Sequence, residues 1–182
     1  MEEDDLILRS KEGDLDAFNR LVEKYQRQVY NLALRMLGKA PAAEDATQEA
    51  LLSAFKGIGG FRGGNFRAWL LRITANACRD QMRFWRRRPV VSLDALVIEP
   101  EGDAQSPEDY ALRRELGDEI AKALAALPAD QRLAVILYDI EGLSYEEIAL
   151  VMTSSLGTVR SRLSRGRARL RLYLEPRMEL LP

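Results

Sequence analysis

The chain has 182 residues, 47% of them hydrophobic, with 27 Lys and Arg, 28 Asp and Glu, one Cys and no His. This length suits one domain or two small ones, and the hydrophobic content excludes global disorder. The missing histidines exclude a Ser-His-Asp or Cys-His catalytic set and His-ligated zinc, and a single cysteine excludes an internal disulfide and a four-Cys metal site.

The amino terminus is acidic over residues 1–5, whereas a secretory signal peptide opens with basic residues. No apolar run approaches the roughly 18 residues that a membrane span needs. We therefore expect a cytoplasmic protein with no membrane insertion of its own.

Two amphipathic helices are predicted first. Apolar residues at steps of three and four indicate a helix over 14–37 that Gly38 ends, and Pro41 begins a second helix running to about Lys56. The second helix has a mostly polar face with i, i+3, i+4 and i+7 spacing, formed by Asp45, Gln48, Glu49 and Leu52. This face is a poor metal site, and chemistry alone leaves open whether it is only a solvated surface.

Five glycines within residues 57–65 predict a loop, followed by a third helix over about 66–85. This helix mixes aromatic residues with arginines, a combination that suits single-stranded nucleic acid, because bases stack on rings while cations follow the backbone. Trp69 lies on the apolar side and is expected in the core. Cys78 is expected to be a small buried hydrophobe.

Residues 89–107 contain three prolines, a glycine and many acids, which indicates a linker. Helical periodicity resumes in four segments, over about 108–127, 128–139, 144–152 and 157–173. No strand pattern is convincing. The predicted fold class is all-α, with two small helical domains over 1–88 and 108–182 joined by a flexible acidic linker.

The last two segments have the features of a helix-turn-helix. Ser144 and Glu147 form a capping box at the start of the first helix. The second helix has an apolar stripe formed by Val159, Leu163, Gly166 and Leu170. The opposite arc holds arginines and small side chains, which would let the helix approach bases in the major groove. The alternative is an ordinary helical hairpin with a charged surface.

Charge is segregated along the chain. Residues 62–88 hold eight arginines and one acid, a net charge of +7, and residues 156–173 hold six arginines and no acid, a net charge of +6. Between them, residues 89–119 hold nine acids and two arginines, a net charge of −7. The whole-chain charge of −1 therefore conceals two arginine blocks suited to phosphates and base edges.

Three sequence motifs resemble those of the bacterial extracytoplasmic-function sigma factors and occur in the same order. The resemblance spans about residues 6–174. Gly142–Ala149 with Gly157–Leu163 resembles the helix-turn-helix of the family's fourth region. Three segments resemble the family's second region, namely Asp45–Leu51, Phe61–Gly63 and Phe66–Asn76. The resemblance implies two helical domains that bind core RNA polymerase, at its clamp helices and flap, and direct it to promoters under the control of an anti-sigma factor.

The resemblance also implies a role for particular residues. It implies polymerase-binding residues at Asp45, Gln48, Glu49 and Leu52. Contacts to the melted −10 element are implied for Phe61, Arg62, Asn65, Arg72, Asn76, Arg79 and Arg83. Contacts to the duplex −35 element are implied for Thr158, Arg160, Ser161, Ser164, Arg165 and Arg167. It implies no catalytic residue, metal or cofactor, and a linker that threads the nucleic-acid channels of polymerase.

The sequence departs from the family pattern at three places. The loop between Phe61 and Phe66 is one residue shorter than is common, Thr153 stands where glycine is frequent, and Ser155 stands where the turn often has proline. The loop length bears on which base could be captured there.

Two other hypotheses remain open. A stand-alone helix-turn-helix regulator would bind duplex DNA tightly without polymerase, usually as a dimer, but no dedicated dimer helix is evident. An enzyme or a helical scaffold is the third possibility, and the sequence has no histidine, metal cluster or phosphate loop to support an enzyme.

Overall fold

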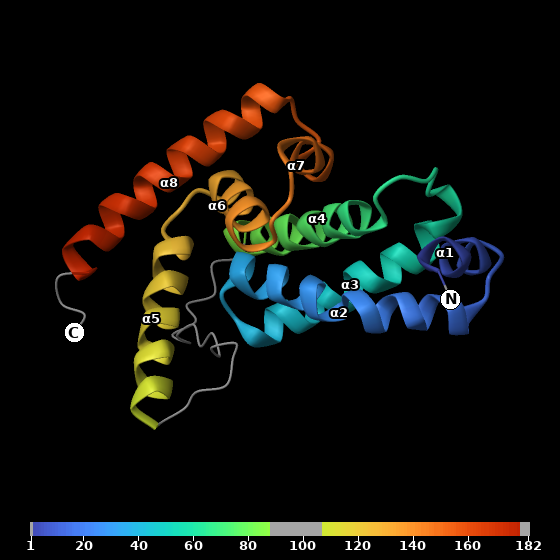
Figure 1. The fold of residues 1–182 in the computed structure, drawn as a ribbon, viewed down its shortest axis with the longest axis horizontal. Helices are drawn as coiled ribbons and strands as arrows, with labels where there is room; N and C mark the ends of the chain where they lie inside the picture. Colours follow the sequence, from blue (N-terminus) through green and yellow to red (C-terminus); the bar gives the residue numbers. More distant parts are fainter. Residues whose placement is uncertain (1, 88–106, 179–182) are drawn as a thin grey trace.

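The computed structural model describes residues 2–87 and 107–178, and every regular element within these ranges is helical (Figure 1). The elements in chain order are α1 (Glu3–Lys11), α2 (Leu15–Leu37), α3 (Ala40–Gly57), η1 (Ile58–Gly60), α4 (Phe66–Arg87), α5 (Pro107–Ala125), α6 (Ala129–Val135), η2 (Ile136–Ile140), α7 (Tyr145–Met152) and α8 (Leu156–Met178). The all-α prediction is confirmed. The predicted linker over 89–107 lies outside the described residues, except that α5 begins at Pro107, so the domain limits stay predictions.

The limits of α2 and the packing of α3 follow from local features of their sequences. The Asp14 carboxylate caps α2 by accepting backbone hydrogen bonds from Asp16 (2.9 Å) and Ala17 (3.0 Å). Gly38 ends α2 in the left-handed conformation. In α3, a stripe of four fully buried alanines packs against α2 and α4, formed by Ala43, Ala46, Ala50 and Ala54. The opposite side of α3 consequently faces solvent.

Helix α1 is not predicted by the sequence pattern, because its only buried apolar residues are Leu6 and Ile7. It is fixed on α2 by Glu3, whose carboxylate accepts hydrogen bonds from the Tyr25 hydroxyl (2.7 Å) and the Lys24 ammonium. Although burial opposes the effect, these two donors lower the pKa of Glu3. A few polar contacts therefore dock a helix that periodicity alone does not reveal.

The prediction of an uninterrupted loop over 57–65 is wrong at its start, because α3 extends to Gly57 and η1 is a 3₁₀ turn. The rest of the segment is a loop in which Gly63 and Gly64 both have φ of +91°, a backbone conformation that residues with a Cβ rarely adopt. Asn65 then caps α4, since its side-chain oxygen accepts a hydrogen bond from the Ala68 backbone N–H (2.9 Å).

Aromatic packing anchors this loop to the core. The Phe61 ring lies 5.6 Å from that of Phe66 and 5.3 Å from that of Trp69. Trp69 is partly buried against the core, in keeping with its prediction. Cys78 is fully buried, as predicted, and burial raises the pKa of its thiol to about 12, so the thiol stays protonated at neutral pH.

The carboxyl-terminal helices follow the predicted order with shifted limits. Helix α6 continues directly into η2, a π-helix that ends at Ile140, one residue beyond the predicted limit. The capping box of α7 is confirmed: the Glu147 backbone N–H donates to the Ser144 hydroxyl (3.2 Å), and the Ser144 N–H donates to the Glu147 carboxylate (2.8 Å). Helix α8 is longer than the predicted 157–173.

Thr153 ends α7 in the left-handed region with φ of 50°, alone among the non-glycine residues of the described chain. A Cβ costs about 1–2 kcal/mol in this region. We expect Thr153→Gly to raise the free energy of unfolding by about 1 kcal/mol, measured by urea denaturation. Ser154→Gly, one residue on and without a positive φ, should give no gain. A Thr153→Gly variant no more stable than the wild type would show that the backbone at Thr153 is not strained.

The two helix groups, α1–α4 and α5–α8, pack together. Their buried side chains form one continuous core, and α7 lies against α4 (Figure 1). Arg132 of α6, which is 8% exposed, donates hydrogen bonds to the carbonyls of Met36 at the end of α2, of Ala125 at the end of α5 (2.7 Å) and of Leu127 just after α5 (3.2 Å). Burial lowers the pKa of this guanidinium, and helix-end carbonyls, which lack partners within their helices, bind it.

Candidate nucleic-acid interface

Helix α8 has one buried and one exposed face, as the periodicity predicts. Val159 and Leu163 are buried, and Gly166 contacts α6 so closely that an added Cβ would lie 2.8 Å from Val135 Cγ2. On the outer side, three predicted DNA-contacting side chains are exposed, namely Arg160, Ser164 and Arg165. The buried stripe therefore orients two guanidinium groups and a hydroxyl toward solvent.

The first turn of α8 is closed by its own hydroxyl groups. The Ser155 hydroxyl accepts a hydrogen bond from the Thr158 backbone N–H (3.2 Å) and lies 2.9 Å from the Thr158 hydroxyl. The Ser161 hydroxyl donates to the Thr158 carbonyl (3.0 Å). Ser155 thus caps α8 in place of the proline that is frequent there. Thr158 and Ser161 shape the start of the helix, and their hydroxyls already have partners.

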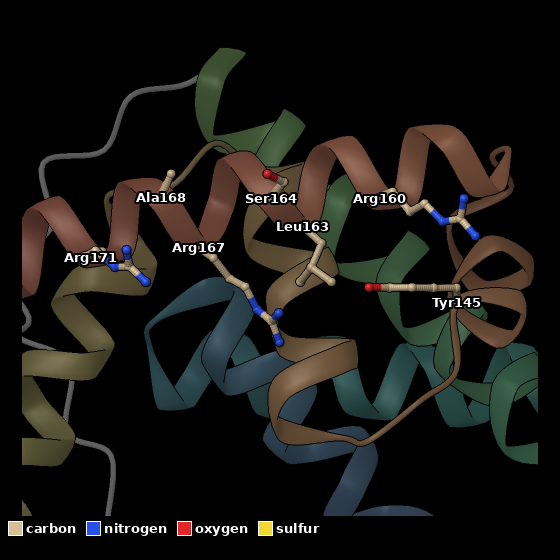
Figure 2. A pocket seen from close by; sticks show the side chains of 7 residues that line it. All are labelled: Tyr145, Arg160, Leu163, Ser164, Arg167, Ala168 and Arg171. Carbon is tan, nitrogen blue, oxygen red and sulfur yellow. The ribbon is translucent and has the colours of Figure 1, made fainter.

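Arg167 lies on the flank of α8, between the buried stripe and the exposed face. Its Nε donates to one Asp139 oxygen (3.0 Å), a second nitrogen donates to the other oxygen, and Asp139 raises the pKa of the guanidinium. This arginine lines an open pocket of ≈340 Å³, shown in Figure 2, whose walls are Tyr145, Arg160, Leu163, Ser164, Arg167, Ala168 and Arg171. Its guanidinium is exposed as well, but its pairing with Asp139 distinguishes it from Arg160 and Arg165.

The glycine loop borders a second pocket, of ≈350 Å³, lined by residues 60–65 together with Ala68, Trp69, Arg72 and Leu150. Arg62 and Arg72 are exposed at this site. Phe61, predicted as a contact to a melted base, is only 6% exposed and faces the aromatic cluster. Its ring therefore supports the loop from within and presents little surface to a ligand.

The other predicted residues of this surface follow the loop along α4. At spacings of three and four, Arg72, Asn76, Arg79 and Arg83 lie on one side of the helix. Asn76 accepts a hydrogen bond from Arg79 (3.2 Å), and Arg83 pairs with Asp80. We call this row of four, together with Arg62 and Asn65, the α4 strip.

Acids of the carboxyl-terminal group lie against the α4 strip. The Asn65 amide donates to the Glu147 carboxylate, and an Arg79 nitrogen lies 3.6 Å from an Asp130 oxygen. Asp130 also pairs with Arg162 of α8 at 2.8 Å. The two arginine-rich surfaces are thus joined through acids that the sequence reasoning missed.

Glu141 is the most buried of these acids, with a side chain 7% exposed. Its carboxylate is 3.1 Å from an Arg67 nitrogen and 3.8 Å from an Arg35 nitrogen, and its carbonyl accepts a 2.7 Å hydrogen bond from Arg67. Arg67 also donates to Gln28 (3.0 Å). In this arrangement both arginines hold the helix-turn-helix against the amino-terminal group.

The predicted polymerase-binding face lies on α3, opposite its buried alanine stripe. All four of its members are exposed, namely Asp45, Gln48, Glu49 and Leu52. Leu52 is 60% exposed, so the face offers an apolar side chain beside its polar ones. Within the part of the chain that the structure describes, none of the polar members has a side-chain partner, so the face is accessible.

No group of three or more His, Cys, Asp or Glu residues that could hold a metal ion lies within residues 2–87 and 107–178. No helix in those ranges is long and apolar enough to cross a membrane.

Known proteins resemble both halves of the chain. Residues 21–88 match the family described as Sigma-70 region 2, and residues 117–170 match Sigma-70, region 4. The RNA polymerase sigma-H factor of Pseudomonas aeruginosa is 39% identical over 179 residues, covering 94% of this chain and 93% of the relative. The ECF RNA polymerase sigma-E factor of Escherichia coli K12 is 37% identical over 182 residues, with the same coverage.

A solved structure has a similar fold over most of its length. It is the sigma factor RpoE in complex with the anti-sigma factor NepR from Bartonella quintana, with a TM-score of 0.71 and 30% sequence identity. The similarity covers 88% of this chain and 98% of the solved one.

Proposed function

Because the chain belongs to the extracytoplasmic-function (ECF) family of RNA polymerase sigma factors, and so directs transcription initiation, we propose how its surfaces divide that task. The exposed face of α8 reads the −35 element as duplex, the α4 strip binds the melted −10 element, and the exposed face of α3 binds core polymerase. Sigma factors are not enzymes, so the chemistry of RNA synthesis belongs to the polymerase.

The observation that carries this proposal is the arrangement of unpaired arginines. Arg160 and Arg165 project from α8, and Arg62 and Arg72 project from the α4 strip, without an acid partner in the described ranges. Guanidinium groups bind phosphates and the guanine edge in a planar, two-pronged geometry. Two separate surfaces of this kind suit two separate promoter elements better than a single operator half-site.

The residues of the α4 strip take different parts in binding the melted strand. Arg62 and Arg72 border the pocket at the glycine loop, where a base that has left the stack would enter, and their charges suit the phosphates beside it. Asn76 offers an amide for the base edge. Phe61 and Trp69 support the loop, and the short loop fixes the depth of the pocket.

The partners follow from the family. The chain acts in the cytoplasm with core polymerase, and its acidic linker, residues 89–107, passes through the nucleic-acid channels of that enzyme. An anti-sigma factor holds it inactive. The solved relative from Bartonella quintana, whose structure is a complex with the anti-sigma factor NepR, supports this last proposal.

Promoter binding requires the two helix groups to separate, because Glu147 and Asp130 occupy partners on the α4 strip. We expect Glu141→Gln to loosen the packing of the groups by about 1–3 kcal/mol, since Arg67 and Arg35 lose a buried charged partner. Small-angle scattering should then give a larger radius of gyration for the free protein. Glu146→Gln removes the same charge from an exposed position and should stay compact.

The proposed function is tested by adding the purified chain to core polymerase and mapping transcript starts on promoter fragments. Specific starts that depend on the chain are expected. A chain that does not bind core polymerase, yet binds free duplex tightly as a dimer, would favour the stand-alone regulator.

A further inference from the structure

Two tyrosines form an aromatic platform beside α8. The rings of Tyr138, from η2, and Tyr145, the first residue of α7, are stacked with centroids 5.1 Å apart and planes 20° apart. Both residues are half-buried and pack against the core. They come from the two segments on either side of the short connection over residues 141–144.

Two arginines of α8 lie over this platform. The Arg160 Cζ is 5.7 Å from the Tyr145 ring centroid, and the Arg167 Cζ is 4.8 Å from that of Tyr138. The two arginines are seven residues apart, two helical turns, so they share one side of α8. In Figure 2 both extend from this side, with Tyr145 beneath Arg160. A cation over an aromatic face is attracted by the ring quadrupole.

The two arginines differ in what else they contact. Arg167 also makes two hydrogen bonds to Asp139, so part of its donor set is occupied. The Arg160 side chain has no hydrogen bond or ion pair within the described residues, and its guanidinium lies over the Tyr145 ring. The Tyr145 ring therefore restricts the direction of the Arg160 side chain, while the guanidinium N–H groups remain available to a ligand.

We infer that Tyr145 is a specificity-determining positioning residue, whose ring holds Arg160 ready to contact one base pair of the −35 element. The inference rests on the proposed function. A free arginine loses rotamer entropy when it is fixed at a base, and a ring that restricts the side chain beforehand reduces that loss. Arg167, tied to Asp139, keeps the Tyr138 side of the platform in place.

The test uses the full chain with core polymerase and promoters that carry each base at every −35 position. Arg160→Ala identifies the base pair that Arg160 reads. Tyr145→Leu should reduce the preference at that same base pair by roughly two- to fivefold, whereas Tyr145→Phe, which keeps the ring, should retain it. The Tyr145 hydroxyl makes no hydrogen bond within the described ranges, so its loss is expected to cost little. In the double variant, Tyr145→Leu should add nothing to Arg160→Ala.

Three results would overturn the inference: equal loss on all sequences, loss at a different base pair, or equal loss with Tyr145→Phe. Thermal unfolding of each variant separates a folding defect from a binding defect, and Tyr145→Met supplies a second ringless variant if Tyr145→Leu does not fold. Failure of the proposed function is distinguishable, because the wild type itself would then show no promoter-specific starts.

Discussion

Replacing Gln48 and Glu49 together by alanine should weaken binding to core RNA polymerase by at least about tenfold, because interface side chains that matter typically cost more than 1 kcal/mol each when truncated. Both side chains are exposed on the outer face of α3 and have no partner in the described chain. Their loss should leave the fold unchanged, since the opposite alanine stripe holds α3 in place.

The chain offers a matched control for this variant. Glu23 and Gln26 on α2 are likewise exposed, and alanine at both removes the same two chemical groups from a different surface. Titration of labelled protein with core polymerase should give wild-type affinity for this control. Unchanged affinity for the Gln48 and Glu49 variant, or an equal loss in the control, would refute the polymerase-binding assignment.

Gly166→Ala should lower the free energy of unfolding by about 1–3 kcal/mol, the range found when a packed contact is overfilled. The added Cβ would lie 2.8 Å from Val135 Cγ2 and 3.1 Å from the Gln131 carbonyl oxygen. The backbone oxygen cannot rotate away, so α8 must move off α6. The sign of the change in unfolding free energy distinguishes a close contact from open space, because Gly→Ala inside an unhindered helix stabilises by about 1 kcal/mol.

Gly157→Ala is the control for the second variant. A Cβ at Gly157 would meet only the Ser155 hydroxyl, at 3.9 Å. This change should therefore leave the free energy of unfolding unchanged or raise it. Urea denaturation of both variants measures the difference. A Gly166→Ala protein as stable as the wild type would show that α8 and α6 are less closely packed than described.

The helices with strong local signals could be predicted from the sequence. These signals are the Asp14 cap, Gly38 and the Ser144–Glu147 capping box. Each one acts over only a few neighbouring residues, so its geometry follows from the spacing in the sequence. The buried stripe of α8 follows from the helical period. Helix α1 could not be found this way, because it is held by contacts between Glu3 and α2.

The candidate site was harder to predict where its residues meet partners distant in the chain. Glu141 and Glu147 lie more than seventy residues from Arg67 and Asn65, with no local pattern to link them. Phe61 was expected to face a base, but its ring packs instead against the rings of Phe66 and Trp69. The helical period does not single out Arg167 either, since it places Arg167 about 80° and Arg160 about 100° from Val159, on the same side of α8.

The net charge of −1 now has a structural interpretation. The arginine blocks are partly paired in the described arrangement, because Asp130 pairs with one arginine of α4 and one of α8. The same charges that suit promoter DNA hold the free chain together when DNA is absent.

The division of the two promoter elements between two surfaces is the central claim, and selection from promoters with both elements randomised tests it most directly. Transcripts made by core polymerase with the wild-type chain should select bases in both elements. Arg160→Ala should relax selection at one −35 base pair by about 1–3 kcal/mol and leave −10 selection intact, whereas Asn76→Ala should alter −10 selection alone. Variants that alter the same element, or a wild type that selects neither, would contradict the account.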